Sequence, residues 1–156
     1  MNEQQQQQQV QHPKVLINIM LINCNETRIL FVKKKNQSYW DLLGHVLEYG
    51  ETYEKRVKRI MSETTFKMDE NIFDKIKYIC SFNAVNEEKK RHFVEIMYAL
   101  KISEKEMIYV DESVFKYWRW MTMDEINEEQ LFFGFQKFLE KYKVKEIKDI
   151  LKIKSI

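Results

Sequence analysis

"GHVLEYGETYEKRVKRIMSETTF", residues 44–66, is the stretch that decides how this chain folds. It begins with a loop of the form Gly-x5-Gly-Glu and continues into a segment with helical spacing, which predicts a helix over residues 52–66. At about 100° per residue, the less polar side chains of this helix share one arc of roughly 100°. They are Val57, Ile60, Met61 and Thr64. We therefore expect this face of the helix to be buried against a sheet.

The charged residues of this stretch suit chemistry on phosphates. A glycine-containing loop that leads into a helix brings backbone and carboxylate groups together near a phosphate. Here Glu51 follows the second glycine, Arg59 comes within the helix, and Glu63 stands one turn beyond Arg59. The loop alone is not specific, but its combination with these charged residues is.

The rest of the chain predicts a mixed sheet between helices. Runs rich in β-branched and aromatic residues predict strands over residues 15–22, 28–33, 76–82, 92–102 and 117–121. The first two read as a hairpin, and the third and fourth as neighbouring antiparallel strands. Helical spacing appears again over residues 127–142 and 144–153. We assign the fold class α/β (α+β), a three-layer α/β/α sandwich with a mixed sheet.

Composition narrows the range of functions. The chain has 156 residues, 44% of them hydrophobic and 32% charged, which fits one globular domain without a membrane span. The net charge of +2 argues against nucleic acid as a partner. Cys24 and Cys80 are too far apart in sequence for a zinc or redox motif, so we expect both in the core. We expect an intracellular protein, cytoplasmic by default or part of an organelle assembly.

Three segments follow from the same composition. Residues 1–13 form a polar tail with a glutamine run that does not favour a core. Residues 14–142 hold the predicted sheet and helices. Residues 143–156 are rich in lysine with interleaved aliphatic residues, which predicts an amphipathic helix. That helix would dock on its own domain, on a protein partner, or on an acidic surface.

Residues 44–66 resemble the Nudix box, G-x5-E-x7-R-E-U-x-E-E-x-G-U, where U is a bulky aliphatic residue. The approach Trp40-Asp41-Leu42-Leu43-Gly44 stands before the box. The matching positions are Glu51, Arg59, Met61 and Glu63. The departures are His45 for the first Gly, Ile60 and Thr64 for two Glu, and Phe66 for the last Gly.

The resemblance extends over nearly all of residues 14–142. The phrases "HFVEIMYAL", "YWRWMTMDEI" and "QLFFGFQKFL" follow in the order seen in the small eukaryotic Nudix nucleoside triphosphate diphosphatases. It implies the Nudix fold and, in an active member, hydrolysis of a nucleoside diphosphate-linked substrate. It also implies that a homodimer is a plausible state.

The resemblance further implies a magnesium site on the helix. The family holds several Mg²⁺ ions with carboxylates of the box, together with the carbonyl of the residue matched by Gly44. Of the four carboxylates only Glu51 and Glu63 remain, with Arg59 as their organiser, because Ile60 and Thr64 replace the other two. The carbonyl of Gly44 is the third oxygen ligand that the resemblance implies. Mg²⁺ prefers oxygen ligands, so this loss weakens the site. We expect no cofactor, or Mg²⁺ if the protein is active.

Two residues could compensate for the missing carboxylates. His45 could add a nitrogen ligand, although a solvated loop histidine is the simpler interpretation. Glu95 interrupts a strand that is otherwise apolar, where a charge must be paired or line a wet cleft. It would either reach the metal groove as a displaced carboxylate or form an ion pair with Arg91 or Arg119.

The aromatic residues near the C-terminus have two interpretations. Phe132 and Phe133 match an aromatic pair that helps to form the purine pocket of the resembling enzymes. An aromatic face stacks a base whether or not the phosphates are cleaved. The alternative is that Phe132, Phe135 and Leu139 are core residues, because their spacing is helical.

Three functions remain in view. The first is a pseudoenzyme: a Nudix-fold binding or structural subunit of a larger protein assembly, without efficient hydrolysis. The second is an active Mg²⁺-dependent nucleotide pyrophosphohydrolase with a rearranged metal site. The third is a module that binds a nucleotide and does not hydrolyse it.

Overall fold

The computed structural model describes residues 12–23, 28–64, 72–102, 110–128 and 130–142. The strands are β1 (Lys14–Asn23), β2 (Arg28–Lys34), β3 (Leu43–Val46), β4 (Lys77–Asn86), β5 (Arg91–Ile102) and β6 (Phe115–Met121). The helices are α1 (Tyr53–Met61), α2 (Ile72–Lys75), α3 (Met123–Glu128) and α4 (Phe133–Lys141). All five predicted strands are present.

The strands form one mixed sheet in the order β4-β5-β1-β2-β6, with β3 paired to β1 beside this path. β1 and β5 are parallel over ten residue pairs, from Lys14 opposite Phe93 to Asn23 opposite Ile102. The other pairings are antiparallel, including the predicted pairs β1–β2 and β4–β5. The mixed α+β fold expected from the sequence is therefore confirmed.

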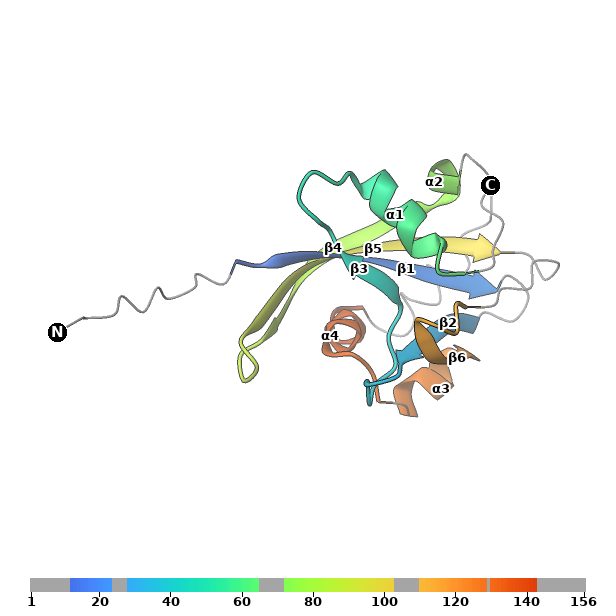
Figure 1. Ribbon diagram of the computed structural model, residues 1–156. Coiled ribbons are helices and arrows are strands. Elements are labelled where there is room, and N and C mark those ends of the chain that lie inside the picture. Colours follow the sequence, from blue (N-terminus) through green and yellow to red (C-terminus); the bar gives the residue numbers. More distant parts are fainter. Residues whose placement is uncertain (1–11, 24–27, 65–71, 103–109, 129, 143–156) are drawn as a thin grey trace.

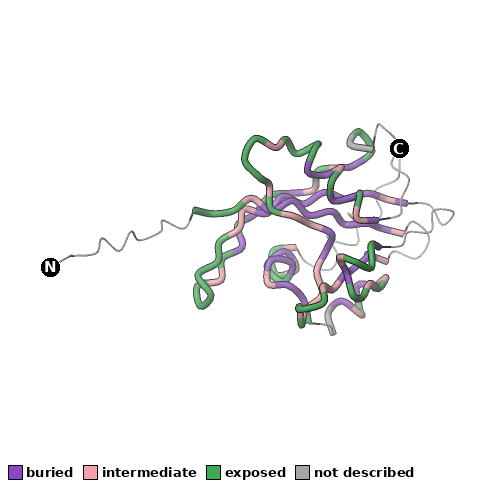
Figure 2. The backbone as a smooth tube through the Cα atoms, viewed as in Figure 1, coloured by how far each residue is buried: buried purple, intermediate pink, exposed green. Residues whose placement is uncertain are grey.

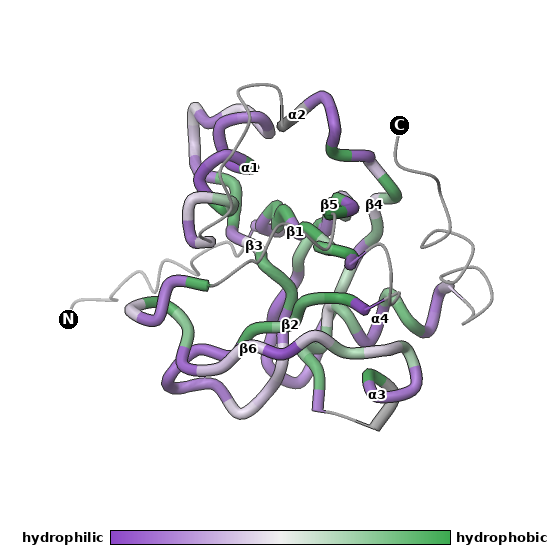
Figure 3. The backbone as a smooth tube through the Cα atoms, turned by 90° about the vertical axis from the view of Figure 1, so that its right-hand side faces the viewer, coloured by the Kyte–Doolittle hydropathy of each residue, from purple (hydrophilic) through white to green (hydrophobic). Residues whose placement is uncertain are grey.

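Helices lie on both faces of this sheet, with α1 and α2 on one side and α3 and α4 on the other (Figure 1). Because side chains alternate along a strand, β1 contributes to both cores. Ile17 and Ile19 join the core under α1, while Met20 and Ile22 join the core under α4. In Figure 2 the backbone of the central strands is coloured as buried. In Figure 3 hydrophobic residues follow β1 and β2.

Helix α1 buries the face that the sequence predicted. Val57, Ile60 and Met61 are fully buried in the core that includes Ile17 and Ile19. The helix is shorter than expected, since it ends at Met61 and residues 62–64 form a turn. The rest of the predicted helix lies outside the described residues.

The single helix predicted over residues 127–142 is wrong at residues 130–132, where the described structure is not helical. Helix α3 ends at Glu128 and α4 begins at Phe133, and Leu131 between them forms an isolated β-bridge with Trp40. This segment pairs with the approach loop: the Trp40 N–H donates to Gln130 O at 2.8 Å, and the Phe132 N–H donates to Trp40 O at 2.8 Å. A tertiary strand contact thus overrides the local helical spacing.

Other expectations lie outside the described residues or are met. Three of them lie outside the described residues: the predicted helix over residues 144–153, residues 1–11 of the polar tail, and Cys24. Cys80 is a buried free thiol on β4, as expected. In the described part of the chain, no helix is long and apolar enough to cross a membrane.

Candidate functional site

The box stretch forms a strand, a loop and a helix. Gly44 and His45 belong to strand β3, which pairs with β1, rather than to a loop as the sequence suggested. Gly50 adopts a φ of 77°, a left-handed conformation that glycine reaches without steric cost. Thr52 then begins α1, because its side-chain hydroxyl accepts from the Lys55 N–H at 3.2 Å.

Ile60 and Thr64 provide no oxygen toward a metal site. Ile60 is 0% exposed within the apolar core under α1. Thr64 is buried, and its hydroxyl donates to Met61 O at 2.7 Å. Backbone pairing also covers this end of the helix, since Thr64 bridges Val110 and the Asp111 N–H donates to Glu63 O at 2.8 Å.

Glu51 is held by two arginines. Its carboxylate accepts from Arg56 Nε at 2.6 Å and from an Arg59 nitrogen at 3.0 Å. Desolvation opposes the shift, yet the bonds from the Glu48 N–H and the two guanidinium groups hold the pKa of Glu51 below its usual value. Arg59 is the organiser that the sequence predicted, whereas Arg56, which is almost fully buried, was missed.

Glu63 is paired with His45. His45 Nε2 contacts Glu63 Oε1, which joins β3 to the end of α1. The second oxygen, Glu63 Oε2, is buried and has no hydrogen-bond partner among the described residues. His45 is therefore not a solvated loop residue, and it occupies the carboxylate that was expected to bind metal.

Gly44 is a close-contact position. A Cβ at this residue would overlap Asn18 Oδ1 and lie 2.8 Å from Ile17 O, so β3 approaches β1 more closely than a larger residue allows. Gly44 and Asn18 are paired residues of the two strands. This glycine is therefore explained by sheet packing as well as by its place before the box.

Glu95 lies on the opposite face of the sheet from α1. It packs against the start of α4, where a Cβ on Gly134 would overlap Glu95 Oε1. Glu95 is 1% exposed, and neither carboxyl oxygen has a hydrogen-bond partner among the described residues. The structure thus does not bring Glu95 together with Glu51 and Glu63. The expected ion pair with Arg91 or Arg119 is wrong too, and β1 and β2 separate β5 from Arg119 on β6.

Asp41 is the neighbour of Glu95 that the sequence did not single out. The pKa of Glu95 is raised to about 8, mainly by desolvation and also by the nearby Asp41 carboxyl, while the Asn18 side chain acts in the opposite direction. Desolvation also raises the pKa of Asp41 to about 7, against the Leu42 N–H and Lys34. The sequence signal for Asp41 was its place between Trp40 and the leucines at 42 and 43, because an acid within an apolar run is a candidate for burial.

An aromatic group borders these acids. Phe132 and Phe133 have ring centroids 4.6 Å apart, and Phe93 lies 6.1 and 5.8 Å from them. Tyr39 lies 5.5 Å from Phe132. Phe133 is half-buried and Phe132 is 8% exposed, whereas Phe135 and Phe138 belong to the core under α4. The core interpretation is thus confirmed for Phe132 and Phe135, which are buried, and a role of Phe132 and Phe133 in binding a base stays a prediction.

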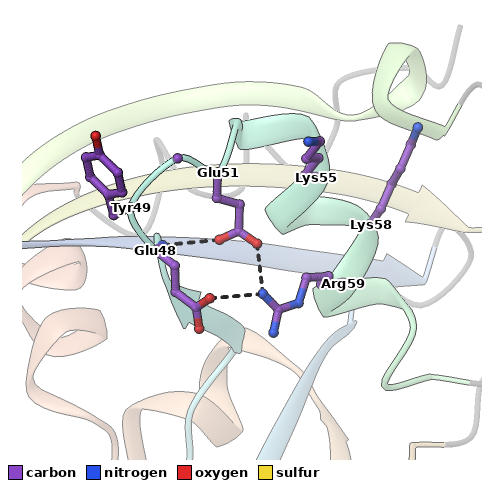
Figure 4. Close-up of a pocket in the computed structure, with 7 residues that line it drawn as sticks. Glu48, Tyr49, Glu51, Lys55, Lys58 and Arg59 are labelled. Carbon is purple, nitrogen blue, oxygen red and sulfur yellow. Dashed lines mark hydrogen bonds and ion pairs between the residues drawn. The ribbon is translucent and has the colours of Figure 1, made fainter.

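A surface pocket of about 440 Å³ lies over the loop and the outer side of α1 (Figure 4). It contains both acids and bases, which are already bonded to one another: Glu48 and Glu51 both accept from Arg59. The lining residues are Glu48, Tyr49, Gly50, Glu51, Lys55, Lys58 and Arg59. The pocket is therefore close to neutral in charge.

The residues present do not fit a multi-ion Mg²⁺ centre. Such a centre needs several anionic oxygens free to coordinate. Here two arginines hold Glu51 and His45 holds Glu63. Across the described ranges, no group of three or more His, Cys, Asp or Glu side chains is placed to hold a metal ion.

The fold and the loop-helix stretch of residues 44–64 together define the class of protein to which this chain belongs. The sequence model of the NUDIX domain matches residues 12–142, and the chain belongs to the Nudix family. The comparison with curated proteins gave no match.

Solved structures share the fold at low sequence identity. The NUDIX domain of Shewanella oneidensis NrtR, in complex with ADP ribose, has a TM-score of 0.68 and 15% identity, covering 91% of this chain and 90% of that one. A MutT NUDIX hydrolase from Burkholderia pseudomallei has a TM-score of 0.63 and 18% identity, covering 85% and 100%. A third structure is a bifunctional NMN adenylyltransferase/ADP ribose pyrophosphatase from Francisella tularensis, in complex with AMP and a manganese ion. Its TM-score is 0.62 and its sequence identity is 16%, and the match covers 83% of this chain and 42% of that one.

Proposed function

We propose that this chain is a Nudix-fold binding or structural subunit of a protein assembly, in which the hydrolytic centre has lapsed. The observation that carries the proposal is the state of the box carboxylates. Two of the expected four are Ile60 and Thr64, and both of these are buried. The remaining two, Glu51 and Glu63, are each bonded to cationic or potentially cationic side chains.

Electrostatics supports this conclusion. A Nudix reaction on a pyrophosphate needs divalent ions to neutralise the phosphates and to activate water. Replacing Ile60 or Thr64 by the expected Glu would each add one negative charge, so the natural chain lacks two charges at this place. Arg56, Arg59 and His45 lie where they compete with a metal ion for the carboxylates that remain.

A hydrolysis assay tests the proposal. The full chain is incubated with Mg²⁺ or Mn²⁺ and a panel of nucleoside triphosphates, dinucleotides and nucleotide sugars, and products are separated by chromatography. We expect the natural chain to show no more metal-dependent turnover than the Glu63→Gln variant. Turnover by the natural chain that the Glu63→Gln and Glu51→Gln variants both lose would instead establish the active pyrophosphohydrolase. A Ser62→Glu variant, which changes charge at an exposed position of the same turn, is the matched control.

A second candidate function is nucleotide binding without cleavage. Phe93 and Phe133 offer partly exposed aromatic surface beside the buried Phe132, and base stacking needs no metal. The related NrtR domain holds ADP ribose. Binding does not require the box carboxylates, so this candidate is compatible with a lapsed centre.

Calorimetric titration separates the two. ADP ribose, ATP and AMP are titrated into the full chain and into the Phe133→Ala variant, with Tyr117→Ala on β6 as a control at an exposed aromatic residue. Binding that Phe133→Ala weakens at least about tenfold, with no effect of Tyr117→Ala, supports a nucleotide module. Absence of binding by the natural chain leaves the structural subunit as the function.

A further inference from the structure

Strand β6 lies at the end of the sheet opposite β4, and its surface carries lysines next to aromatic rings. It pairs with β2 alone among the described strands. Lys33 Nζ lies 4.6 Å from the ring centroid of Trp40, and Lys116 Nζ lies 5.0 Å from that of Tyr117. Lys33 and Tyr117 are paired residues of β2 and β6, so their Cβ atoms are about 4.5–5.5 Å apart. We call these four residues, Trp40, Lys33, Tyr117 and Lys116, the lysine–aromatic row.

The lysine–aromatic row lies at the surface. Tyr117 is 49% exposed and Lys116 is exposed, while Lys33 and Trp40 are half-buried. The pairing of β2 with β6 shifts register after Lys33, from Tyr117 to Phe115, which leaves Lys116 without a partner on β2. Both ammonium groups of the row are therefore available to a molecule outside this chain.

The lysines of the row are not neutralised within the described part of the chain. Neither Lys33 nor Lys116 forms an ion pair with a described carboxylate, and the exposed Glu112 in the turn before β6 is no exception. Glu125 on α3 is already paired with Arg119 at 3.9 Å. This edge of the sheet is therefore locally basic, although the net charge of the whole chain is only +2.

The aromatic rings distinguish the row from a simple guard against aggregation. Lysines on an edge strand also protect it from pairing with other strands, but that protection needs no ring beneath each ammonium group. A cation–π contact holds the ammonium group in place, so less side-chain freedom is lost when an anion binds. The row thus has the features of a binding surface for an anion.

The state of the rings favours carboxylates over nucleic acid. Proteins that bind single-stranded nucleic acid stack its bases on open aromatic faces. Here Trp40 and Tyr117 each already have a lysine over the ring. Arg119 stands two residues from Tyr117, on the same face of β6, and it already binds the carboxylate of Glu125. This face therefore recognises carboxylates within its own chain.

We propose that the lysine–aromatic row binds an acidic segment of a partner protein. The segment supplies at least two carboxylates, one for Lys33 and one for Lys116. The inference rests on the proposed function as a subunit of an assembly and names the chemistry of the partner. It does not involve the box carboxylates on the loop and helix α1.

Titration calorimetry of the full chain with a synthetic peptide tests the proposal. The probe is acetyl-Glu-Ser-Glu-Ser-Glu-Ser-Glu-amide, and its matched control has glutamine in place of each glutamate. We expect a Kd between about 10 µM and about 1 mM for the acidic peptide at about 20 mM NaCl. The affinity should fall at least about fivefold at about 150 mM NaCl, because salt screens exposed charges. The glutamine peptide should not bind.

Variants of the chain locate the contact. Lys33→Gln/Lys116→Gln should weaken binding at least about tenfold. The matched control Lys55→Gln/Lys89→Gln removes two exposed lysines elsewhere and should change the Kd less than about twofold. Tyr117→Ala should weaken binding about two- to fivefold, because it removes the ring that holds Lys116, whereas Tyr117→Phe should leave it unchanged. Circular dichroism confirms that each variant is folded.

Three results would overturn the inference. The first is no binding of the acidic peptide up to about 1 mM. The second is an equal loss of affinity in the two double variants, which indicates a general attraction rather than this row. The third is tighter binding of an oligouridylate of about ten nucleotides than of the peptide, which assigns the surface to nucleic acid. None of them depends on hydrolysis, so the lapsed centre is tested separately.

Discussion

At the scale of single residues, the carboxyl groups of this protein fall into two kinds. Glu51 and Glu63 bond to Arg56, Arg59 or His45 on the α1 side of the sheet. Glu95 is enclosed on the α4 side, without hydrogen-bond partners among the described residues. The two arginines and the Glu48 N–H hold the pKa of Glu51 below its usual value, whereas burial raises the pKa of Glu95.

Glu95 predicts a pH-dependent stability. Desolvation raises its pKa from 4.5 to about 8, so the folded state keeps a proton that the unfolded chain has lost. The free energy of unfolding should therefore fall as pH rises from about 4.5 to about 8, by up to about 1.4 kcal/mol per pH unit for this proton. Urea unfolding of the natural chain and of Glu95→Gln, at pH 5 to about 9, measures the difference.

The variant sets the control for this prediction. Glu95→Gln keeps the size of the side chain and removes the titration, so it should be more stable than the natural chain at pH 8 by more than about 1 kcal/mol. In the Glu95→Gln variant the free energy of unfolding should still fall with rising pH, because the pKa of Asp41 is raised as well. Equal pH profiles for the two proteins would contradict the assignment.

At the scale of elements, helix α1 has become a packing element of the sheet. Its buried face combines Val57, Ile60 and Met61, and the turn that follows the helix is bridged to Val110 through Thr64. The outer face keeps charged pairs such as Glu54 and Lys58, which are 3.0 Å apart. The position of a metal ligand, residue 60, now belongs to the core.

This packing predicts what a restored box would cost. Ile60→Glu places a carboxylate in an apolar core, so the free energy of unfolding should fall by at least about 3 kcal/mol. The free energy of unfolding should fall less for Thr64→Glu, just after the helix. For Ser62→Glu, at an exposed position, it should change by less than about 0.5 kcal/mol. Urea unfolding of the three variants gives the order. A well-tolerated Ile60→Glu would show that residue 60 still faces a wet groove.

At the scale of the whole molecule, the sheet connects the α1 site, the Glu95 pair and the β4 edge. β1 contributes Ile17 and Ile19 to the core under α1 and pairs with β5, which carries Glu95 and pairs in turn with β4. Glu51 and Glu63 lie on the α1 side of this sheet, and Glu95 lies against the start of α4 on the other side.

A lapsed metal site predicts a weak thermal response to Mg²⁺. Stabilisation by a ligand follows RT ln(1 + [L]/Kd), which is below about 0.4 kcal/mol when the ion is at or below its Kd. At 10 mM Mg²⁺, with ionic strength matched by NaCl, we expect a Tm increase of less than about 2 °C. A larger increase that Glu63→Gln removes would indicate a working site.

The sequence by itself determined the Nudix assignment, five of the six described strands and the buried face of α1, because these depend on motif spacing and on periodicity along the chain. It missed β3, which is held by its pairing with β1. It also identified Ile60 and Thr64 as replacements for carboxylates. Tertiary structure alone decided that Glu95 faces α4 rather than Glu63, that His45 pairs with Glu63, and that Leu131 leaves the helix to pair with Trp40. The physical reason is that periodicity fixes which side of its own element a residue occupies. What that side meets depends on the register and order of strands distant in sequence.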